Sequence, residues 1–256
     1  MRKIIVLPLL VIVLLNHACN LTGNRGDSST NQGDTLVQEV KRKFTGVKPN
    51  YLDGKLISEI SYRNGIRHGL TKTYYSSGVI KQIIPYCDGL KCDTARWFYE
   101  DGKLFRNTPY LNDMIHGTQV QFYRNGRVKA SMSYEMGIRK NDLQEYYENG
   151  KPVTTKREIL IRTRDEYQEN GVYKIFAELD NKSTKVTFYK GEMPNDLFDP
   201  LKVEKITTSG VTGFMELSRK NGGNPGYVTI IAEYTTNFGN KDYYTKRVTV
   251  PYRDIK

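Results

Sequence analysis

Aromatic, aliphatic and turn-forming residues repeat every 24 positions through the middle of the chain. One series of glycines is spaced by 24 residues, and a second series with the same spacing is offset from it by 11. A tyrosine stands three residues before each of these nine positions, so the chain contains a true 24-residue repeat. The first series is Gly54, Gly78, Gly102, Gly126 and Gly150, the second is Gly65, Gly89, Asp113 and Gly137, and the tyrosines are Tyr51, Tyr62, Tyr75, Tyr86, Tyr99, Tyr110, Tyr123, Tyr134 and Tyr147.

The repeated glycines predict a series of β-hairpins. Most of them follow Asp, Asn or Ser, as in Asp53-Gly54 and Asn64-Gly65. Such pairs between β-prone segments favour two-residue type I′ turns, in which both residues have positive φ. The turns alternate at spacings of 11 and 13 residues, which leaves room for strands of about 7–9 residues. We therefore expect one antiparallel meander, with the Gly54 series of turns along its first border and the Gly65 series along its second border.

Each tyrosine has an expected cross-strand partner, because in a two-residue hairpin it lies opposite the residue two positions after the glycine. An aromatic–aliphatic pair contributes about 0.2–1 kcal/mol, and a cation over an exposed ring contributes about 0.5–1 kcal/mol. The aromatic residue before each first-border tyrosine should point to the opposite face, so the sheet can cohere without a deep core. The expected partners are Leu56, Ile80, Leu104 and Val128 on the first border and Arg67, Lys91, Ile115 and Arg139 on the second, and the preceding aromatics are Tyr74, Phe98, Phe122 and Tyr146.

The repeat resembles the MORN-repeat family. Tyr62-Arg-Asn-Gly-Ile-Arg-His-Gly69, followed by Tyr74-Tyr-Ser-Ser-Gly78, carries the likeness, which extends over about residues 46–152. More narrowly, the chain is similar to the variant described as the antitoxin component of YwqK-type toxin–antitoxin modules. The resemblance implies the repeat fold and says little of function, because such repeats occur in junctional, cytoskeletal, kinase and secreted proteins.

Three residues depart from the repeat pattern. Asp93 and Asn141 replace the third glycine that Gly69 and Gly117 provide, and Asp113 replaces a turn glycine. Asn and Asp tolerate left-handed backbone better than most residues, so we expect the turns to persist there.

The 24-residue period stops near Pro152, and the last hundred residues contain alternating segments that predict further strands. Asn, Gly and Asp separate these segments, which suggests a small β-sandwich of immunoglobulin-like topology. The alternative is that the strands prolong the repeat sheet. The expected fold class is all-β: residues 46–155 form the repeat sheet and 156–256 a C-terminal β domain. The predicted strands cover residues 172–179, 185–189, 211–217, 227–234 and 243–250.

The N-terminus has the features of an export signal. Arg2-Lys3 precedes twelve apolar residues at 4–15, which is too short a stretch for a membrane-spanning helix. Asn16-His17-Ala18-Cys19 then resembles the bacterial lipobox, which implies removal of residues 1–18 and lipidation of Cys19. The alternative is a plain signal peptide cleaved nearby. Residues 19–45 form a predicted tether, because Asn, Gly, Asp, Ser and Thr dominate its first part.

Composition fits a β protein with a positive charge. The 256 residues include 19 Tyr and 22 Gly, which favour strands and turns, and the charged fraction of 26% is too high for a membrane channel. The net charge is +11, or +9 once Arg2 and Lys3 are removed with the signal. This surplus favours anionic partners.

Few residues are available for catalysis or metal binding. His17 leaves with the signal, and His68 and His116 occupy equivalent positions four strands, about 19 Å, apart, too far to share one metal ion. No phosphate loop or HExxH motif is present. We therefore expect no enzyme activity, no cofactor and no metal.

Cys87 and Cys92 flank a predicted turn, and in an oxidising compartment they would form a disulfide; the alternative is two free thiols.

Together these features predict a lipid-anchored repeat protein of the bacterial cell envelope, at the periplasmic face or the outer membrane. Its expected role is a non-catalytic protein-binding or scaffold module, with another protein as partner, the membrane reached through the N-terminal lipid, and no nucleic acid. The first alternative is an antitoxin or immunity protein that neutralises a toxin. The second is a cell-envelope enzyme, which would need a carboxylate pair in a pocket of the C-terminal domain.

Overall fold

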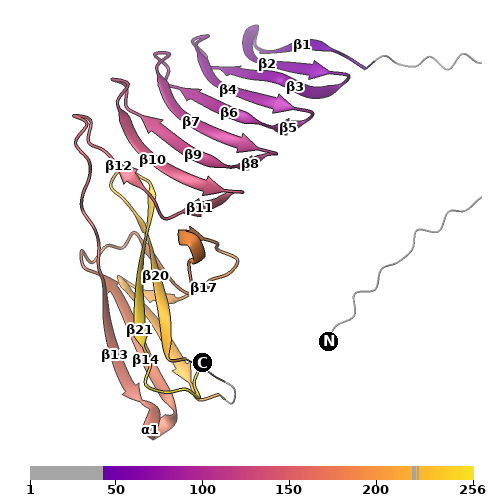
Figure 1. Cartoon of the computed structure of the whole chain (residues 1–256). Helices are drawn as coiled ribbons and strands as arrows, with labels where there is room; N and C mark the ends of the chain where they lie inside the picture. Colours follow the sequence, from indigo (N-terminus) through magenta and orange to yellow (C-terminus); the bar gives the residue numbers. More distant parts are fainter. Residues whose placement is uncertain (1–42, 221–222, 224) are drawn as a thin grey trace, which may run out of the picture. The chain divides into compact units, whose positions relative to one another are not determined.

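The computed structural model describes residues 43–220, 223 and 225–256, whose regular secondary structure is almost entirely β-strand (Figure 1). The predicted signal peptide, Cys19 and the first part of the tether lie outside the described residues. The strands form three antiparallel sheets, one of 13 strands and two of four strands each. In the described part of the chain, no helix is long and apolar enough to cross a membrane. The predicted all-β class is confirmed.

The largest sheet contains the repeats. Its strands are β1 (Gly46–Leu52), β2 (Lys55–Arg63), β3 (Ile66–Tyr74), β4 (Ile80–Cys87), β5 (Leu90–Lys91), β6 (Asp93–Phe98), β7 (Leu104–Leu111), β8 (Met114–Ile115), β9 (Gly117–Phe122), β10 (Val128–Glu135), β11 (Ile138–Lys140), β12 (Gln144–Glu145) and β16 (Leu197–Phe198). The order is β1-β2-β3-β4-β6-β7-β9-β10-β11-β16, and β5, β8 and β12 pair with β4, β7 and β10. Figure 1 shows the hairpins following one another in chain order, from indigo β1 to pink β11, which is the predicted meander.

Two-residue turns join the strands along the second border, as predicted. Asp88 and Gly89 have φ of 48° and 94°, the left-handed values that a type I′ turn requires. The residues that flank them, Cys87 and Leu90, pair directly. The same backbone occurs at Asn64-Gly65, Asn112-Asp113 and Met136-Gly137, and also at Asp53-Gly54 on the first border.

The other turns of the first border are one residue longer, and the prediction of two-residue turns is wrong there. The Tyr75 N–H donates to the Val79 carbonyl (2.8 Å), and the Gly78 N–H donates to the Tyr75 carbonyl (2.9 Å). Gly78 has a positive φ of 84°, and Ser77 has none, so the loop is a type I turn that ends in a glycine bulge. The equivalent hydrogen bonds recur at Gly102, Gly126 and Gly150.

This longer loop changes the cross-strand partners on the first border. Ile80 pairs with Tyr74 and not with Tyr75. The two following hairpins show the same shift, with Leu104 opposite Phe98 and Val128 opposite Phe122. Of the four pairs expected on this border, Tyr51 with Leu56 is the one observed.

Six buried residues of the repeat sheet form one row across its strands. Thr71 pairs with Ile84, Ala95 with Thr108, and Gln119 with Met132, and all six side chains are buried. The Thr108 hydroxyl donates to the Gln119 side-chain oxygen at 3.1 Å, whereas the buried Thr71 hydroxyl has no hydrogen-bond partner among the described residues. The sheet thus has a thin core, and its borders must contribute to its stability.

The remaining strands form a β-sandwich. They are β13 (Ile159–Glu166), β14 (Val172–Leu179), β15 (Val186–Lys190), β17 (Glu204–Lys205), β18 (Thr207–Ser209), β19 (Thr212–Ser218), β20 (Tyr227–Thr235) and β21 (Lys241–Thr249), with the short helices α1 (Tyr167–Asn170) and η1 (Pro194–Asp196) between them. One sheet has the order β13-β14-β19-β18 and the other β17-β15-β20-β21. In chain order these are A-B-E-D and C′-C-F-G, the immunoglobulin-like arrangement that the sequence suggested.

Both small sheets contribute side chains to a single core. Ile175 and Leu217 come from the first sheet, and Phe188 and Ile230 from the second. The five predicted strands correspond to β14, β15, β19, β20 and β21. The prediction missed β13, because four of its last five residues are charged and it lacks a regular apolar–polar alternation. The segment after residue 158 forms sheets of its own, except that β16 pairs with β11 of the repeat sheet.

Candidate functional site

The first-border tyrosines are used by the fold. The Tyr75 hydroxyl donates to the Phe98 carbonyl (2.7 Å), Tyr99 to Phe122 (2.8 Å), and Tyr123 to Tyr146 (2.7 Å). Each bond reaches from one repeat to the next, 23 residues along the chain. Burial raises the pKa of the Tyr99 and Tyr123 phenols. These three side chains therefore hold successive hairpins together and do not present their hydroxyl groups to a ligand.

The tyrosines at the two ends of the first border differ. Tyr51 is 63% exposed, which agrees with its place on the outermost strand. Tyr147 packs its ring edge-on against Phe238, with ring centroids 5.8 Å apart. Phe238 lies in the loop between β20 and β21, so a residue of the sandwich ends this series of tyrosines.

Tyrosines and cations alternate along the second border. Tyr62 pairs across the strands with Arg67, whose guanidinium lies over Tyr86 of the next repeat at 5.5 Å. Tyr86 pairs with Lys91, whose ammonium lies over Tyr110 at 5.2 Å. The cross-strand partners are the predicted ones, but each cation covers the ring of the following repeat. We name Tyr62, Arg67, Tyr86, Lys91, Tyr110, Ile115, Tyr134 and Arg139 the tyrosine–cation row.

The sandwich continues this row beyond the last repeat. Tyr110 pairs with Ile115, which interrupts the alternation, and Tyr134 pairs with Arg139. The Arg139 guanidinium lies 5.6 Å from the ring centre of Tyr243 in β21. Tyr243 thus stands where a further repeat would supply its tyrosine.

Backbone and histidine contacts fix the second-border turns. The Gly89 N–H donates to the Arg67 carbonyl of the preceding hairpin (2.8 Å), and equivalent bonds start at Asp113 and Gly137, while the Gly65 N–H donates to the Phe44 carbonyl before β1. His68 Nδ1 accepts a hydrogen bond from the Asp88 N–H (3.3 Å), and His116 Nδ1 accepts one from the Met136 N–H (3.4 Å). Both histidines therefore have the same structural contact, as their equivalent positions in the repeat imply.

The turn at Asp88 is also held by side chains. Arg63 donates to the Asp88 carboxylate at 2.7 Å, and this bond lowers the pKa of the carboxyl group. Cys87 and Cys92 are joined by a disulfide across the turn, with their Cα atoms 5.8 Å apart.

Asp93 has a positive φ of 57°, so it reproduces the left-handed backbone of Gly69 and Gly117. Asp113 keeps the left-handed backbone of the turn glycine that it replaces, with φ of 67°, whereas Asn141 has no positive φ and its N–H donates to the Asp196 carbonyl.

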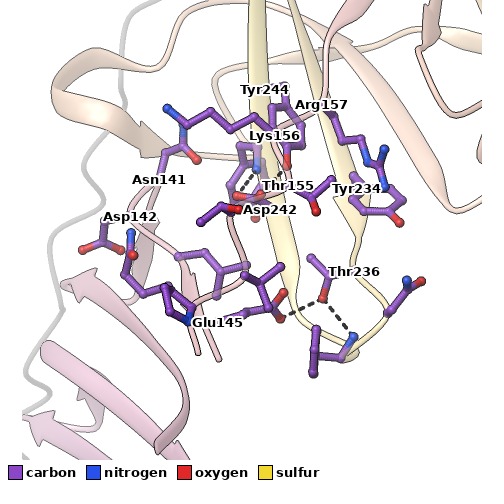
Figure 2. A pocket seen from close by; sticks show the side chains of 18 of the residues that line it. Asn141, Asp142, Glu145, Thr155, Lys156, Arg157, Tyr234, Thr236, Asp242 and Tyr244 are labelled. Atoms are coloured by element: carbon purple, nitrogen blue, oxygen red, sulfur yellow. Dashed lines mark hydrogen bonds between the residues drawn. The ribbon is translucent and has the colours of Figure 1, made fainter. Parts of the chain in front are cut away.

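A cavity of about 750 Å³ lies where the chain leaves the repeats (Figure 2). Figure 2 shows Asp142, Glu145 and Asp242 among its lining residues, together with Lys156 and Arg157. Asp142 accepts a hydrogen bond from the Ser133 N–H. Asp242 accepts one from the Tyr244 hydroxyl at 2.6 Å, and burial together with this bond raises the pKa of the Tyr244 phenol.

Glu145 is the buried acid of this cavity, and it joins the repeats to the sandwich. Its Oε1 accepts hydrogen bonds from the Thr236 hydroxyl (2.8 Å) and the Asn240 amide (2.7 Å), both in the β20–β21 loop. That loop has the same turn as the repeats, because the Thr236 N–H donates to Asn240 and the Gly239 N–H donates to Thr236. The three acids of the cavity thus have structural partners, and the described residues contain no cluster of three or more His, Cys, Asp or Glu that could hold a metal ion.

Comparison with known families identifies the repeat. A family model described as MORN repeat variant matches residues 67–88, 94–112 and 115–136. These three segments lie within the array that the sequence predicts, and they include Tyr75, Tyr86, Tyr99, Tyr110, Tyr123 and Tyr134. A search of curated proteins found no match to the chain. MORN repeats generally serve as protein-binding or membrane-binding modules.

Sequence reasoning missed how both borders connect successive repeats. One signal was available: each first-border tyrosine lies 23 residues before the aromatic residue that precedes the next such tyrosine. The roles of Phe238 and Tyr243 had no comparable signal, because neither residue belongs to the repeat period.

Proposed function

We propose that the protein is a non-catalytic module of the bacterial cell envelope that binds another protein through the tyrosine–cation row. The chain would reach the membrane through lipid on Cys19, which is a prediction from the sequence. The single observation behind the binding role is the contrast between the two borders. First-border hydroxyl groups bond to the next repeat, whereas Tyr62, Tyr86, Tyr110 and Tyr134 form no hydroxyl hydrogen bond within the described part of the chain.

The second border also has the composition of an interface. Tyr and Arg are enriched in protein–protein interfaces, where Tyr contributes apolar area and a polar group together. Directly before Arg67, Lys91 and Ile115, equivalent repeat positions expose the apolar side chains Ile66, Leu90 and Met114, which point to the opposite face because successive side chains in a strand alternate. The cations of the row suit an acidic partner surface, in line with the net charge of +11.

An affinity experiment with the full chain tests this proposal. The protein is used to capture partners from its own cell envelope, and the bound proteins are identified by mass spectrometry. Arg67→Glu with Lys91→Glu should abolish the specific capture, because it reverses both charges in the exposed part of the row. Lys55→Glu with Lys103→Glu makes the same charge change on the first border and should leave capture intact. Equal capture by the wild type and both variants would contradict the proposal.

The antitoxin role implied by the family resemblance is a narrower form of the same proposal. In that case the protein captured by the wild type, and lost with the row variant, would be a toxin. A partner with any other activity would leave the general binding role in place and exclude the antitoxin role.

A further inference from the structure

A second cavity, of about 530 Å³, lies beside the last member of the tyrosine–cation row. Three aromatic residues line it: Tyr189, Phe198 and Tyr243. Phe198 and Tyr243 are stacked with ring centroids 4.5 Å apart, and Tyr189 meets Phe198 edge-on at 5.1 Å. Phe198 and Tyr243 are buried and Tyr189 is half-buried, so the wall of the cavity consists largely of apolar ring surface.

Arg139 also lines this cavity, and its hydrogen bonds are incomplete. The side chain is 8% exposed, and its Nη1 donates to the Lys241 carbonyl. Its Nε and Nη2 are buried and have no hydrogen-bond partner among the described residues. These two nitrogens form one edge of the guanidinium fork, the edge that binds a carboxylate through two parallel hydrogen bonds. A buried donor without a hydrogen-bond partner costs folding free energy, so we expect a hydrogen-bond acceptor to bind at the Nε/Nη2 edge.

The chain's own carboxylates in this cavity have other partners. Glu233 forms an ion pair with Lys241 (2.7 Å), and Asp199 forms one with Lys202 (3.4 Å). Neither is hydrogen-bonded to Arg139 in the structure. At the rim of the cavity stands Leu201, an apolar side chain that is 94% exposed.

We infer that this cavity binds a carboxylate carried on an apolar group, with the carboxylate on the Nε/Nη2 edge of Arg139 and the apolar group against Tyr189, Phe198 and Tyr243. The inference rests on the proposed function in one respect, because the expected source is the C-terminal residue of the partner protein. A free organic acid has the same chemistry. Because both nitrogens are buried, the ion pair forms at low dielectric, and side chains at the rim must move to admit the ligand.

Calorimetric titration of the full chain tests the inference with four probes. N-Acetylphenylalanine is compared with its primary amide, and an eight-residue peptide ending in Phe is compared with the same peptide amidated at its C-terminus. Each acid should bind at least about tenfold more tightly than its amide, because the amide loses the charge and one acceptor. Binding of the peptide acid alone identifies a chain end as the source, and equal binding of both acids identifies a free organic acid. Equal affinity for acids and amides, or no binding of any probe, would overturn the inference.

Substitutions locate the carboxylate. Arg139→Lys keeps the charge and removes the fork, so acid affinity should fall about tenfold, whereas Arg67→Lys, in the same row but outside the cavity, should leave it unchanged. Glu233→Gln removes a neighbouring negative charge and should strengthen acid binding. If Glu233 were instead the resident partner of Arg139, Glu233→Gln would destabilise the fold without strengthening acid binding, and the inference would be wrong.

Two readouts keep this inference separate from the proposed function. Should Arg139→Lys fail to fold, Glu233→Gln and Phe198→Leu still decide the matter, because the first should raise acid affinity and the second should lower it. If the Arg139→Lys variant still captures its partner from the envelope and no probe binds to the wild type, the proposed function is supported and the inference is wrong. Probe binding without any specific capture would support the inference and contradict the proposed function.

Discussion

The hydroxyl group of Tyr99 donates a hydrogen bond to the carbonyl oxygen of Phe122, 2.8 Å away in the next repeat. Tyr75 and Tyr123 form the equivalent bonds, so the first border is a chain of side-chain links between hairpins. Because few residues of the repeat sheet are buried, such links contribute a large part of its cohesion.

Tyr99→Phe should lower the free energy of unfolding by about 1 kcal/mol, since it removes one hydrogen bond and leaves a carbonyl oxygen without its partner. Urea denaturation of the full chain measures this change. Tyr147→Phe is the matched control, because the ring of Tyr147 packs on Phe238 and its hydroxyl has no hydrogen bond in the described residues. Equal losses for the two variants would show that the hydroxyl bond is not the cause.

Stability should fall at alkaline pH through Tyr74. Burial, the hydrogen bond to Glu59 and the charge of Glu59 raise the pKa of Tyr74 to about 12, from an unfolded value of about 10. Between these values the folded state holds the proton that the unfolded state has lost, so the free energy of unfolding decreases as pH rises from about 10 to about 12. Tyr74→Phe should make this decrease shallower, and Tyr51→Phe should not. Denaturant melts across this pH range provide the measurement, and identical slopes in all three proteins would refute the assignment.

The disulfide between Cys87 and Cys92 should form in the exported protein. We expect the intact mass to fall two hydrogens short of the reduced form, with both cysteines in one linked peptide. Cys87→Ser with Cys92→Ser should lower the free energy of unfolding by about 2 kcal/mol, because the bridge closes only a short loop in the unfolded chain. Ready alkylation of both thiols without a reductant would show that the two cysteines are free.

Cys19→Ala should release the protein from detergent-extractable membranes into a soluble or unprocessed pool. This prediction depends on the sequence alone, since Cys19 lies outside the described residues. Mass spectrometry of the N-terminal peptide would show an acyl group on the wild type. An unmodified peptide, with the same fractionation for wild type and variant, would favour the plain signal peptide.

Gly213→Ala should destabilise the sandwich. A Cβ atom at this position would lie 2.7 Å from Cδ2 of Phe188, which is fully buried in the core. Overpacking of this kind typically costs about 1–3 kcal/mol. Combining the change with Phe188→Leu should be less harmful than the sum of the two single variants, because the smaller side chain relieves the clash. Additive losses in urea melts would mean that the clash is relieved in another way.

The parts of the fold that were predicted are those that depend on neighbours in the chain. Asp88-Gly89 forms the type I′ turn that its residue types favour. Asp101-Gly102 and Asn125-Gly126 have the same residue types but form three-residue loops, so residue types alone did not decide the loop length. Ser77-Gly78 belongs to the first glycine series; Ser77 does not adopt positive φ there, and the three-residue loop shifts Tyr75 out of its expected pair. The candidate interface was predicted in part: the cross-strand pair of Tyr86 and Lys91 was expected, whereas the stacking of Lys91 on Tyr110 of the next repeat was not.

By itself, the sequence determined the β class, the 24-residue repeat and the order of its hairpins, because spacing and turn chemistry are local properties. Only the tertiary structure decided how the repeats end. Glu145 bonds to Thr236 across 91 residues, and Arg139 bonds to Lys241 across 102. No periodicity relates residues so far apart, since the sandwich strands return to the last repeat through their own packing. The vacant edge of Arg139 arises from that return, because β21 supplies a partner for one nitrogen of the guanidinium and leaves the other two without one.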